Sequence, residues 1–240
     1  MSDLREKAKP MPDCELVIFD CDGTLMDSEV IASQVETEII NEYGANLTVE
    51  EFGKRFAGTS TQYVRQVMEE ELGRHFPDDH DATVEKAMLE RLWREVKPVA
   101  GALAVLDMFD QPRCVCSNAS MEKVKLELTR AELWDRFRPY VFSAKDMNDI
   151  QSKPAPDVFL HAAKEFGVDP AACLVVEDSI SGVQAGVAAG MRTIGFTGGS
   201  HSHSGHADQL TEAGAETVLN KLTDVPAIIA ILGEWDGPLA

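Results

Sequence analysis

Short apolar runs alternate along the chain with longer stretches whose apolar positions recur every three or four residues. Most of the short runs are apolar throughout, a pattern typical of strands buried on both faces of a parallel sheet. The longer stretches have the spacing of helices that cover such a sheet. This alternation predicts an α/β fold with a doubly wound parallel sheet. The predicted strands are residues 16–19, 114–116, 140–142, 174–176, 193–196 and 217–219, and the predicted core helices are 121–129, 156–166, 181–189 and 206–213.

One interval interrupts this alternation, because only helical patterns lie between the first and second predicted strands. A direct crossover between parallel strands needs about a dozen residues, so the excess predicts an all-helical cap domain inserted after the first strand. We expect this domain at 28–95 and an α/β core domain formed by 1–27 and 96–240, with hinges at 26–27 and 97–101. The helices predicted within the insertion are 28–43, 49–56, 61–72 and 81–96.

Polar and ionisable residues follow the predicted strands where each one ends. In open parallel sheets, ligands bind outside the carboxyl ends of the strands, so these side chains are expected to meet at one edge. Several carboxylates gathered there need a compensating charge, because two unit charges ~4 Å apart repel by about 4 kcal/mol at an effective dielectric constant of about 20. Mg²⁺ takes one or two carboxylates and shares its other positions with water and phosphate. The residues concerned are Asp20, Asp22, Ser117, Asn118, Lys153, Glu177 and Asp178.

This set has the composition of a phosphate site. Lys153 supplies a positive charge, and the backbone N–H groups of Gly23 and Asn118 can bind an anion at a turn and at a helix start. Taken singly, each motif also has a structural explanation, since Asp-Gly favours a tight turn and Ser-Asn before a helix favours a cap. The ordered set, with each member after a strand, favours the functional explanation.

The two aspartates of the first motif can divide the chemistry between them. On an extended strand, residues two apart share a side, so Asp20 and Asp22 would face one way and Cys21 the other. One carboxylate can then attack as a covalent nucleophile, forming an aspartyl-phosphate, while the other moves protons. The sequence therefore predicts a phosphoryl-transfer site rather than a thiol-dependent one.

The net charge and composition of the chain limit the classes of molecule that it is expected to bind. Lys and Arg number 22 against 41 Asp and Glu, a net charge of −19, which disfavours nucleic acid and anionic membranes as partners and leaves a small molecule. The longest purely apolar stretch, 227–232, falls far short of the ~20 residues of a membrane span.

The N-terminal residues and the cysteines bear on the location of the protein. The N-terminal residues carry charges without an apolar segment and do not predict a signal peptide. Five cysteines without a CxxC pair indicate a reduced, cytoplasmic setting. We expect a monomer.

A Gly- and Ser-rich segment at 198–206 carries His201, His203 and His206. Closely spaced histidines can bind a metal ion. In a stretch of this composition we expect a solvated loop instead.

The strand-end residues together resemble the haloacid dehalogenase superfamily of phosphohydrolases, over about residues 14–220. The helical insertion is similar to the cap of the subgroup that contains phosphoglycolate phosphatase, β-phosphoglucomutase and 6-phosphogluconate phosphatase-like proteins. The residues that carry the resemblance are Asp20-Cys21-Asp22-Gly23-Thr24-Leu25 for the first motif, Ser117 for the second, Lys153 for the third and Glu177-Asp178 for the fourth.

The resemblance implies a role for each motif residue. Asp20 would be the nucleophile and a Mg²⁺ ligand, and Asp22 the general acid/base, with its backbone carbonyl touching the metal. Ser117 and Lys153 would hold the transferring phosphoryl group, and the cap would close over the substrate. The other implied residues are the metal ligands Glu177 and Asp178, and the cap-loop residues Gly58 and Thr59 beside the substrate.

Departures from neighbouring branches favour a phosphatase of a sugar or sugar-acid phosphate over a phosphosugar mutase. The mutase branch has a histidine where this chain has Ala32, and it holds a second phosphate with a Lys and an Arg that the loop at 57–61 lacks. Arg55 or Arg65 could hold that phosphate in another geometry, so the mutase stays open. A receiver-like signalling protein also uses a phosphorylated aspartate, but such proteins are shorter and have no helical cap. The sequence does not identify the substrate.

Overall fold

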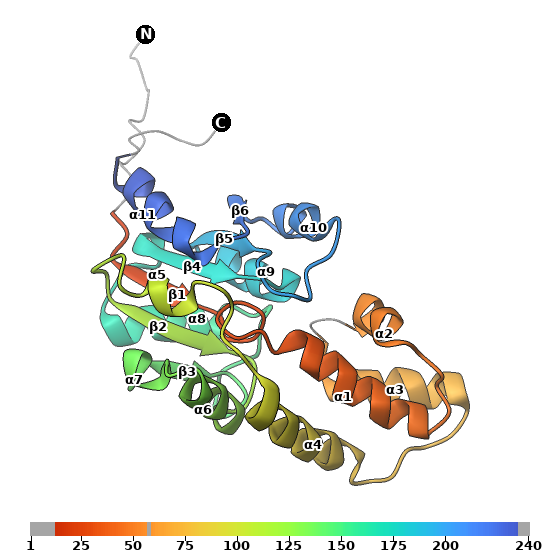
Figure 1. Ribbon diagram of the computed structural model, residues 1–240. Coiled ribbons are helices and arrows are strands. Elements are labelled where there is room, and N and C mark those ends of the chain that lie inside the picture. Colours follow the sequence, from red (N-terminus) through yellow and green to blue (C-terminus); the bar gives the residue numbers. More distant parts are fainter. Residues whose placement is uncertain (1–12, 57–58, 235–240) are drawn as a thin grey trace.

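A computed structural model describes residues 13–56 and 59–234 of the chain. Six parallel strands form one sheet in the order β3-β2-β1-β4-β5-β6, with helices on both faces (Figure 1). The predicted doubly wound α/β fold is confirmed. The strands are β1 (Leu16–Phe19), β2 (Arg113–Ser117), β3 (Val141–Ser143), β4 (Cys173–Glu177), β5 (Arg192–Phe196) and β6 (Thr217–Leu219).

The first strand lies in the middle of the sheet and is buried on both faces. It pairs in parallel with β2 and with β4, and all four of its residues are buried. Val17 and Phe19 point into the larger apolar cluster, and Leu16 and Ile18 into a second cluster on the opposite face. An uninterrupted apolar run is what such a strand requires.

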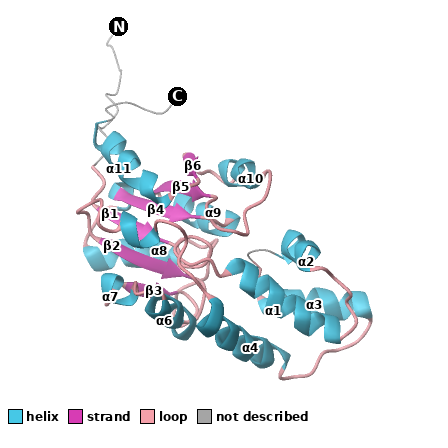
Figure 2. Cartoon of the chain, in the orientation of Figure 1, coloured by secondary structure: helices cyan, strands magenta, loops and turns pink. Residues whose placement is uncertain are grey.

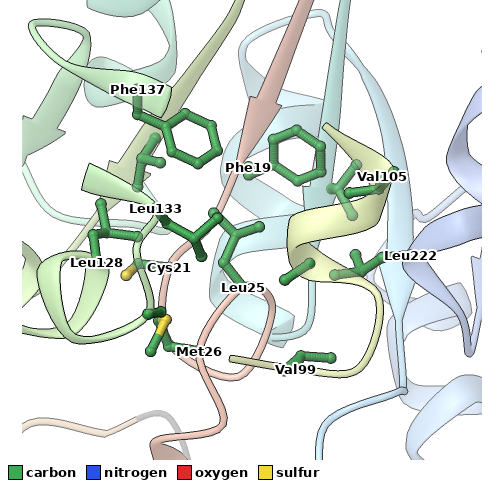
Figure 3. Close-up of a cluster of buried hydrophobic side chains, with 14 of the residues drawn as sticks. Phe19, Cys21, Leu25, Met26, Val99, Val105, Leu128, Leu133, Phe137 and Leu222 are labelled. Atoms are coloured by element: carbon green, nitrogen blue, oxygen red, sulfur yellow. The ribbon is translucent and has the colours of Figure 1, made fainter. Parts of the chain in front are cut away.

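The two apolar clusters attach most of the core helices to the sheet, and α10 packs through Leu210 in a smaller cluster with Val183. Side chains from α5, α6, α7 and α11 share the cluster of Phe19, whose ring packs against that of Phe137 (Figure 3). The ring of Phe109 stacks on the same phenylalanine. Side chains from α8 and α9 fill the cluster on the other face. The core helices are α5 (Ala102–Val105), α6 (Met121–Arg130), α7 (Trp134–Phe137), α8 (Asp157–Phe166), α9 (Ile180–Ala188), α10 (His206–Glu212) and α11 (Val225–Glu234), with short 3₁₀ turns at Pro170–Ala172 and Leu222–Asp224.

Between β1 and the short core helix α5 the described chain forms four helices and no strand, as predicted. The helices group together beyond the carboxyl ends of the strands (Figures 1 and 2), and an apolar cluster of their own includes Ile40, Phe52 and Phe56. The helix α4 also packs against the core helix α6. The helices are α1 (Glu29–Glu42), α2 (Val49–Phe56), α3 (Thr61–Leu72) and α4 (His80–Glu95). The domain boundaries at 27/28 and 95/96 remain our proposal.

The two connections to this insertion lie side by side. Met26 forms a bridge with Pro98, and the Asp27 backbone N–H donates to the Lys97 carbonyl oxygen at 2.9 Å. These are the segments predicted as hinges from the sequence. The hinge role of the two segments stays a prediction.

The sequence patterns leave three core helices out and shift one strand. Helices α5 and α7 span four residues each, too short for a helical period to show. The described part of α11 follows a 3₁₀ turn at the end of the chain. Strand β3 begins one residue later than predicted and has three residues. No helix among residues 13–56 and 59–234 is long and apolar enough to cross a membrane.

Candidate active site

Three strand ends and one loop meet at the carboxyl edge of the sheet. Asp20 follows β1, Ser117 ends β2 and Glu177 ends β4. Because β1 pairs with both β2 and β4, these three residues are brought side by side. The backbone N–H of Asp20 donates to the Val176 carbonyl oxygen at 3.0 Å, which extends the pairing up to the site.

Lys153 enters this edge from the loop after β3 and binds the first-motif carboxylate. Its Nζ lies 2.5 Å from Asp20 Oδ1, 2.8 Å from Glu177 Oε1 and 2.7 Å from the Cys116 carbonyl oxygen. The ammonium group is buried, and although burial lowers its pKa, the two carboxylates outweigh that effect and raise the pKa above its ordinary value. Lys153 is therefore a fixed positive charge at the bottom of the site.

Asn118 holds the Lys153 segment in place. Its Oδ1 accepts from the Lys153 backbone N–H at 2.8 Å, and its Nδ2 donates to the Lys153 carbonyl oxygen at 3.2 Å. The side-chain amide of Asn118 is thus occupied by the neighbouring loop. Its backbone N–H remains the group predicted to bind phosphate.

Three buried carboxylates form an acidic triad beside this lysine: Asp20, Glu177 and Asp178. Their oxygens lie within 4.8 Å of one another. Burial, followed by the charges of the neighbouring carboxylates, raises the pKa of Asp20 well above its ordinary value against the opposing effect of Lys153. One lysine does not balance three carboxylates, so the triad has the excess of negative charge and the all-oxygen donor set that suit a divalent cation such as Mg²⁺.

Close packing fixes the two fourth-motif carboxylates. Asp178 Oδ1 accepts from the Thr24 hydroxyl at 2.8 Å, and Glu177 Oε2 accepts from the Ser179 backbone N–H at 2.8 Å. Two glycines make room for them. A Cβ on Gly23, which has φ +79°, would lie 2.0 Å from Asp178 Oδ2, and a Cβ on Gly182 would lie 1.8 Å from Glu177 Oε1.

The phosphate-binding role predicted for Gly23 remains a prediction. Its backbone N–H already donates to the Met26 carbonyl oxygen at 2.7 Å, inside the turn that follows β1. What the structure assigns to this glycine is the left-handed backbone conformation and the close approach of Asp178.

Asp22 lies in a different environment from Asp20. Its Oδ1 is 2.6 Å from Lys123 Nζ and accepts from the Ser28 hydroxyl at 2.7 Å. Burial acts to raise the pKa of Asp22, but Lys123 and Ser28 outweigh it and hold the pKa below its ordinary value. The side chain is therefore an ionised carboxylate outside the acidic triad.

The expected strand alternation through Cys21 is wrong in one respect. Strand β1 ends at Phe19, and the chain then turns, so that the Leu25 and Met26 N–H groups both donate to the Cys21 carbonyl oxygen. As a result Cys21 and Asp22 do not point to opposite sides, and both side chains approach Glu127. Cys21 is buried, and burial raises its thiol pKa well above the ordinary value, which agrees with its exclusion as a nucleophile.

The histidine loop is not simply solvated, which corrects the expectation from its composition. His206 is buried, and its Nε2 lies 2.8 Å from the Asp178 carbonyl oxygen. His201 Nε2 lies 3.0 Å from Asp178 Oδ2, a contact that outweighs burial and raises the pKa of His201. Only His203 of the three is exposed. The loop supports the acidic triad from the side of β5 because its histidines find partners there.

Three further residues were predicted for the site: Ser117, Thr59 and Gly58. Ser117 is buried, and its hydroxyl accepts from the Ala119 backbone N–H at 3.0 Å. Thr59 is exposed in the insertion, and its hydroxyl donates to the Phe56 carbonyl oxygen at 2.7 Å. Gly58 lies outside the described residues.

Sequence reasoning missed Lys123, Ser28, Thr24 and Glu127. An acidic residue at an apolar position of the α6 sequence could have indicated Glu127 and its neighbour Lys123. Glu127 falls between Val124 and Leu128 on the apolar face of α6, one turn after Lys123, and a carboxylate at such a position requires a buried partner. The hydroxyls of Ser28 and Thr24 gave no comparable indication.

Comparisons with known proteins agree with this geometry. The sequence profile of the haloacid dehalogenase-like hydrolases matches residues 14–190. The 6-phosphogluconate phosphatase of Escherichia coli (strain K12) is 34% identical over 189 residues, which cover 78% of this chain and 85% of that protein.

Two crystal structures share the fold over most of both chains. A haloacid dehalogenase-like protein of unknown function from Agrobacterium tumefaciens is 45% identical with a TM-score of 0.84, covering 91% of this chain and 98% of that one. A family hydrolase from Deinococcus radiodurans, solved with bound phosphate and sodium, is 28% identical with a TM-score of 0.77, covering 91% and 96%. The resemblance read from the motifs is confirmed: the chain is an enzyme of the haloacid dehalogenase-like hydrolase family.

Proposed function

We propose that the protein is a Mg²⁺-dependent phosphatase of a small phosphorylated metabolite that reacts through an aspartyl-phosphate at Asp20. The observation that carries this proposal is the position of the Asp20 carboxylate. It lies at the end of the central strand, 2.5 Å from the Lys153 ammonium and inside the acidic triad. A nucleophilic carboxylate next to a fixed cation and a metal-type donor set is suited to attack phosphorus.

The chemistry divides into two transfers. In the first, an Asp20 oxygen attacks phosphorus and the bond from phosphorus to the leaving oxygen breaks. Asp22, which would take up a proton when the negatively charged phosphate ester binds beside it, gives that proton to the leaving oxygen. In the second, a water oxygen attacks the same phosphorus and passes a proton to Asp22. The bond to Asp20 then breaks and inorganic phosphate leaves. Lys153 and the Ser117 hydroxyl would hold the phosphoryl oxygens in both steps.

The acidic triad fits Mg²⁺ by its oxygen donors, its burial and its unbalanced charge. Asp20, Glu177 and Asp178 would hold the ion, with the Asp22 backbone carbonyl as a further ligand implied by the family. When bound, the ion would supply positive charge for the phosphoryl oxygens and favour the ionised form of Asp20.

The insertion favours phosphatase over phosphosugar mutase. Arg55 and Arg65 were the cations that could have held a second phosphate. Arg55 is paired with Glu71 at 2.5 Å, and Arg65 with Asp81 at 3.4 Å. With these guanidinium groups engaged inside the insertion, water is favoured over a second sugar phosphate as the acceptor. The helical insertion itself disfavours a receiver-like signalling role.

For the substrate we propose a sugar or sugar-acid phosphate. The support is the relative named for 6-phosphogluconate and the phosphate bound with sodium in the Deinococcus structure. We further propose a cytoplasmic location, supported by five free thiols. The monomeric state remains a prediction from the sequence.

A panel of phosphate esters tests the proposed activity. We expect release of inorganic phosphate from at least one sugar or sugar-acid phosphate with Mg²⁺, and none with EDTA. Phosphoglycolate and nucleotides serve as comparison compounds. Isomerised hexose phosphate without phosphate release would favour the mutase, and no turnover of any ester would contradict the proposal.

A further inference from the structure

Lys123 lies between the Asp22 carboxylate and a second carboxylate, Glu127, which belongs to none of the four motifs. Its Nζ is 2.6 Å from Asp22 Oδ1 and 3.9 Å from Glu127 Oε1. Glu127 is fully buried, and its other oxygen lies 3.7 Å from the Cys21 thiol. We call this arrangement the Lys123 bridge.

Two residues of the Lys123 bridge, Lys123 and Glu127, lie on helix α6, which is packed firmly into the core. Helix α6 starts after Ser120, whose hydroxyl accepts from the Lys123 backbone N–H, so the lysine occupies the first turn at a fixed end. Val124 and Leu128 of the same helix are fully buried in the main apolar cluster, and α6 also packs on α4. The spacing of four residues places Lys123 and Glu127 one above the other on this face.

Stability does not account for the bridge. Removing a lysine and two carboxylates from water has a desolvation cost that often exceeds the attraction between them. Apolar side chains at positions 123 and 127 together would fill the same face of α6 without that cost. The specific effect of the lysine is instead on the position of the Asp22 carboxylate, whose Oδ1 it shares with the Ser28 hydroxyl.

We infer that Lys123 is a positioning residue, anchored by Glu127, that fixes the Asp22 carboxylate where it exchanges a proton with the leaving oxygen. This inference rests on the proposed phosphatase activity and extends it to a residue outside the four motifs. Ser28 holds the same oxygen from the start of the insertion, so the carboxylate is held between α6 and the segment that leads into α1.

The role predicts a dependence on the leaving group. In the first transfer the bond from phosphorus to the leaving oxygen breaks while Asp22 gives that oxygen a proton. An alkyl ester leaves as an alcohol and needs that proton, whereas p-nitrophenyl phosphate leaves as a stabilised phenolate and does not. Displacing Asp22 should therefore slow alkyl esters selectively.

The experiment compares kcat/KM for p-nitrophenyl phosphate with kcat/KM for the best alkyl phosphate of the panel. For Lys123→Met we expect kcat/KM on the alkyl ester to fall by about 100-fold and that on the aryl ester by no more than about threefold, given what a positioned proton donor contributes. Lys123→Arg should restore part of the loss. Lys125→Met is the matched control, because Lys125 lies exposed on the same helix beside Trp134, and should behave as wild type.

Two further variants keep the test decisive. In an Asp22→Asn background, Lys123→Met should change kcat/KM for neither the alkyl nor the aryl ester any further, because the effect of Lys123 passes through Asp22. If Lys123→Met does not fold, Ser28→Ala should show the same selective loss in a milder form. Equal losses on both esters in folded variants, or an unchanged alkyl rate, would overturn the inference. A wild-type protein that hydrolyses neither ester would contradict the proposed function instead.

Discussion

Gly182 allows Glu177 to lie in the acidic triad. The first turn of α9 passes directly over the end of β4, and a Cβ at position 182 would lie 1.8 Å from Glu177 Oε1 and 1.9 Å from its carboxyl carbon. Glu177 is also held by Lys153 and Ser179, so it has no room to withdraw without losing those bonds. The glycine therefore determines the geometry of the site although it carries no functional group.

A Gly182→Ala substitution should expel the Glu177 carboxylate from its place. We expect a loss of about 1–3 kcal/mol in the free energy of unfolding, as for other overpacked sites, together with weaker Mg²⁺ binding. Chemical denaturation and calorimetric Mg²⁺ titration would measure the two effects. Gly53→Ala is the control, because the nearest atom to its Cβ would be 3.9 Å away, and an alanine within α2 should stabilise by about 0.5–1 kcal/mol. A Gly182→Ala protein with wild-type stability and Mg²⁺ affinity would contradict this explanation.

Among the described residues of the helical insertion, His80 is an ionisable group that is buried against aromatic rings. His80 begins α4 and is buried, with its ring 4.9 Å from that of Phe76 and 5.6 Å from that of Tyr43. Its Nδ1 has no hydrogen-bond partner within the described structure. Burial lowers the pKa of His80 below its ordinary value of 6.5, against the opposing effect of Asp81.

This shift makes the insertion less stable in acid. The unfolded chain binds a proton at His80 more readily than the folded one, so stability is present above pH 6.5 and is lost as the pH falls towards the lowered pKa. His80→Phe should therefore lose less thermal stability than wild type between about pH 7.5 and about pH 5.5. The matched control is His75→Gln, since His75 is exposed. Identical losses for wild type and His80→Phe would contradict the assignment.

The elements that the sequence predicts well are those with a strong period. Strand β1 and the insertion helices α2 and α3 fall on the predicted residues, because an apolar run or a long amphipathic repeat is a local property. Helices α5 and α7 were missed because four residues carry no period. They form on the apolar cluster around Phe19, which exists only after the chain has folded (Figure 3).

At the scale of the whole molecule, the candidate site likewise contains residues that the sequence pattern predicts and residues that only tertiary contacts bring in. Strand order brings the ends of β1 and β4, and therefore Asp20 and Glu177, together, and the loop after β3 reaches the same edge with Lys153. Residues far apart in sequence could therefore be predicted as neighbours. Strand order gives no indication that Lys123 and His201 reach the site, because they come from one helix face and one irregular loop. Composition indicated a solvated histidine loop, and tertiary contacts with Asp178 overrode it.

The molecule as a whole carries a net charge of −19, which opposes the approach of a phosphorylated substrate. Attraction must therefore come from local charge at the carboxyl edge of the sheet. Among the described residues, the lysines bound to carboxylates there are the buried Lys153 and the partly buried Lys123, each already paired with an aspartate. This is the physical reason to expect that a metal ion is needed to offset the acidic triad before an anion can bind.

Whether Asp20 becomes phosphorylated during turnover tests the central claim most directly. The protein would be mixed with Mg²⁺ and its best substrate from the panel, quenched in acid within a single turnover, and digested for mass spectrometry. We predict a phosphorylated peptide that contains Asp20 in the wild-type protein, and neither this peptide nor phosphate release in a folded Asp20→Asn variant. Near-normal phosphate release by Asp20→Asn, or a phosphoryl group on any other residue, would contradict the account.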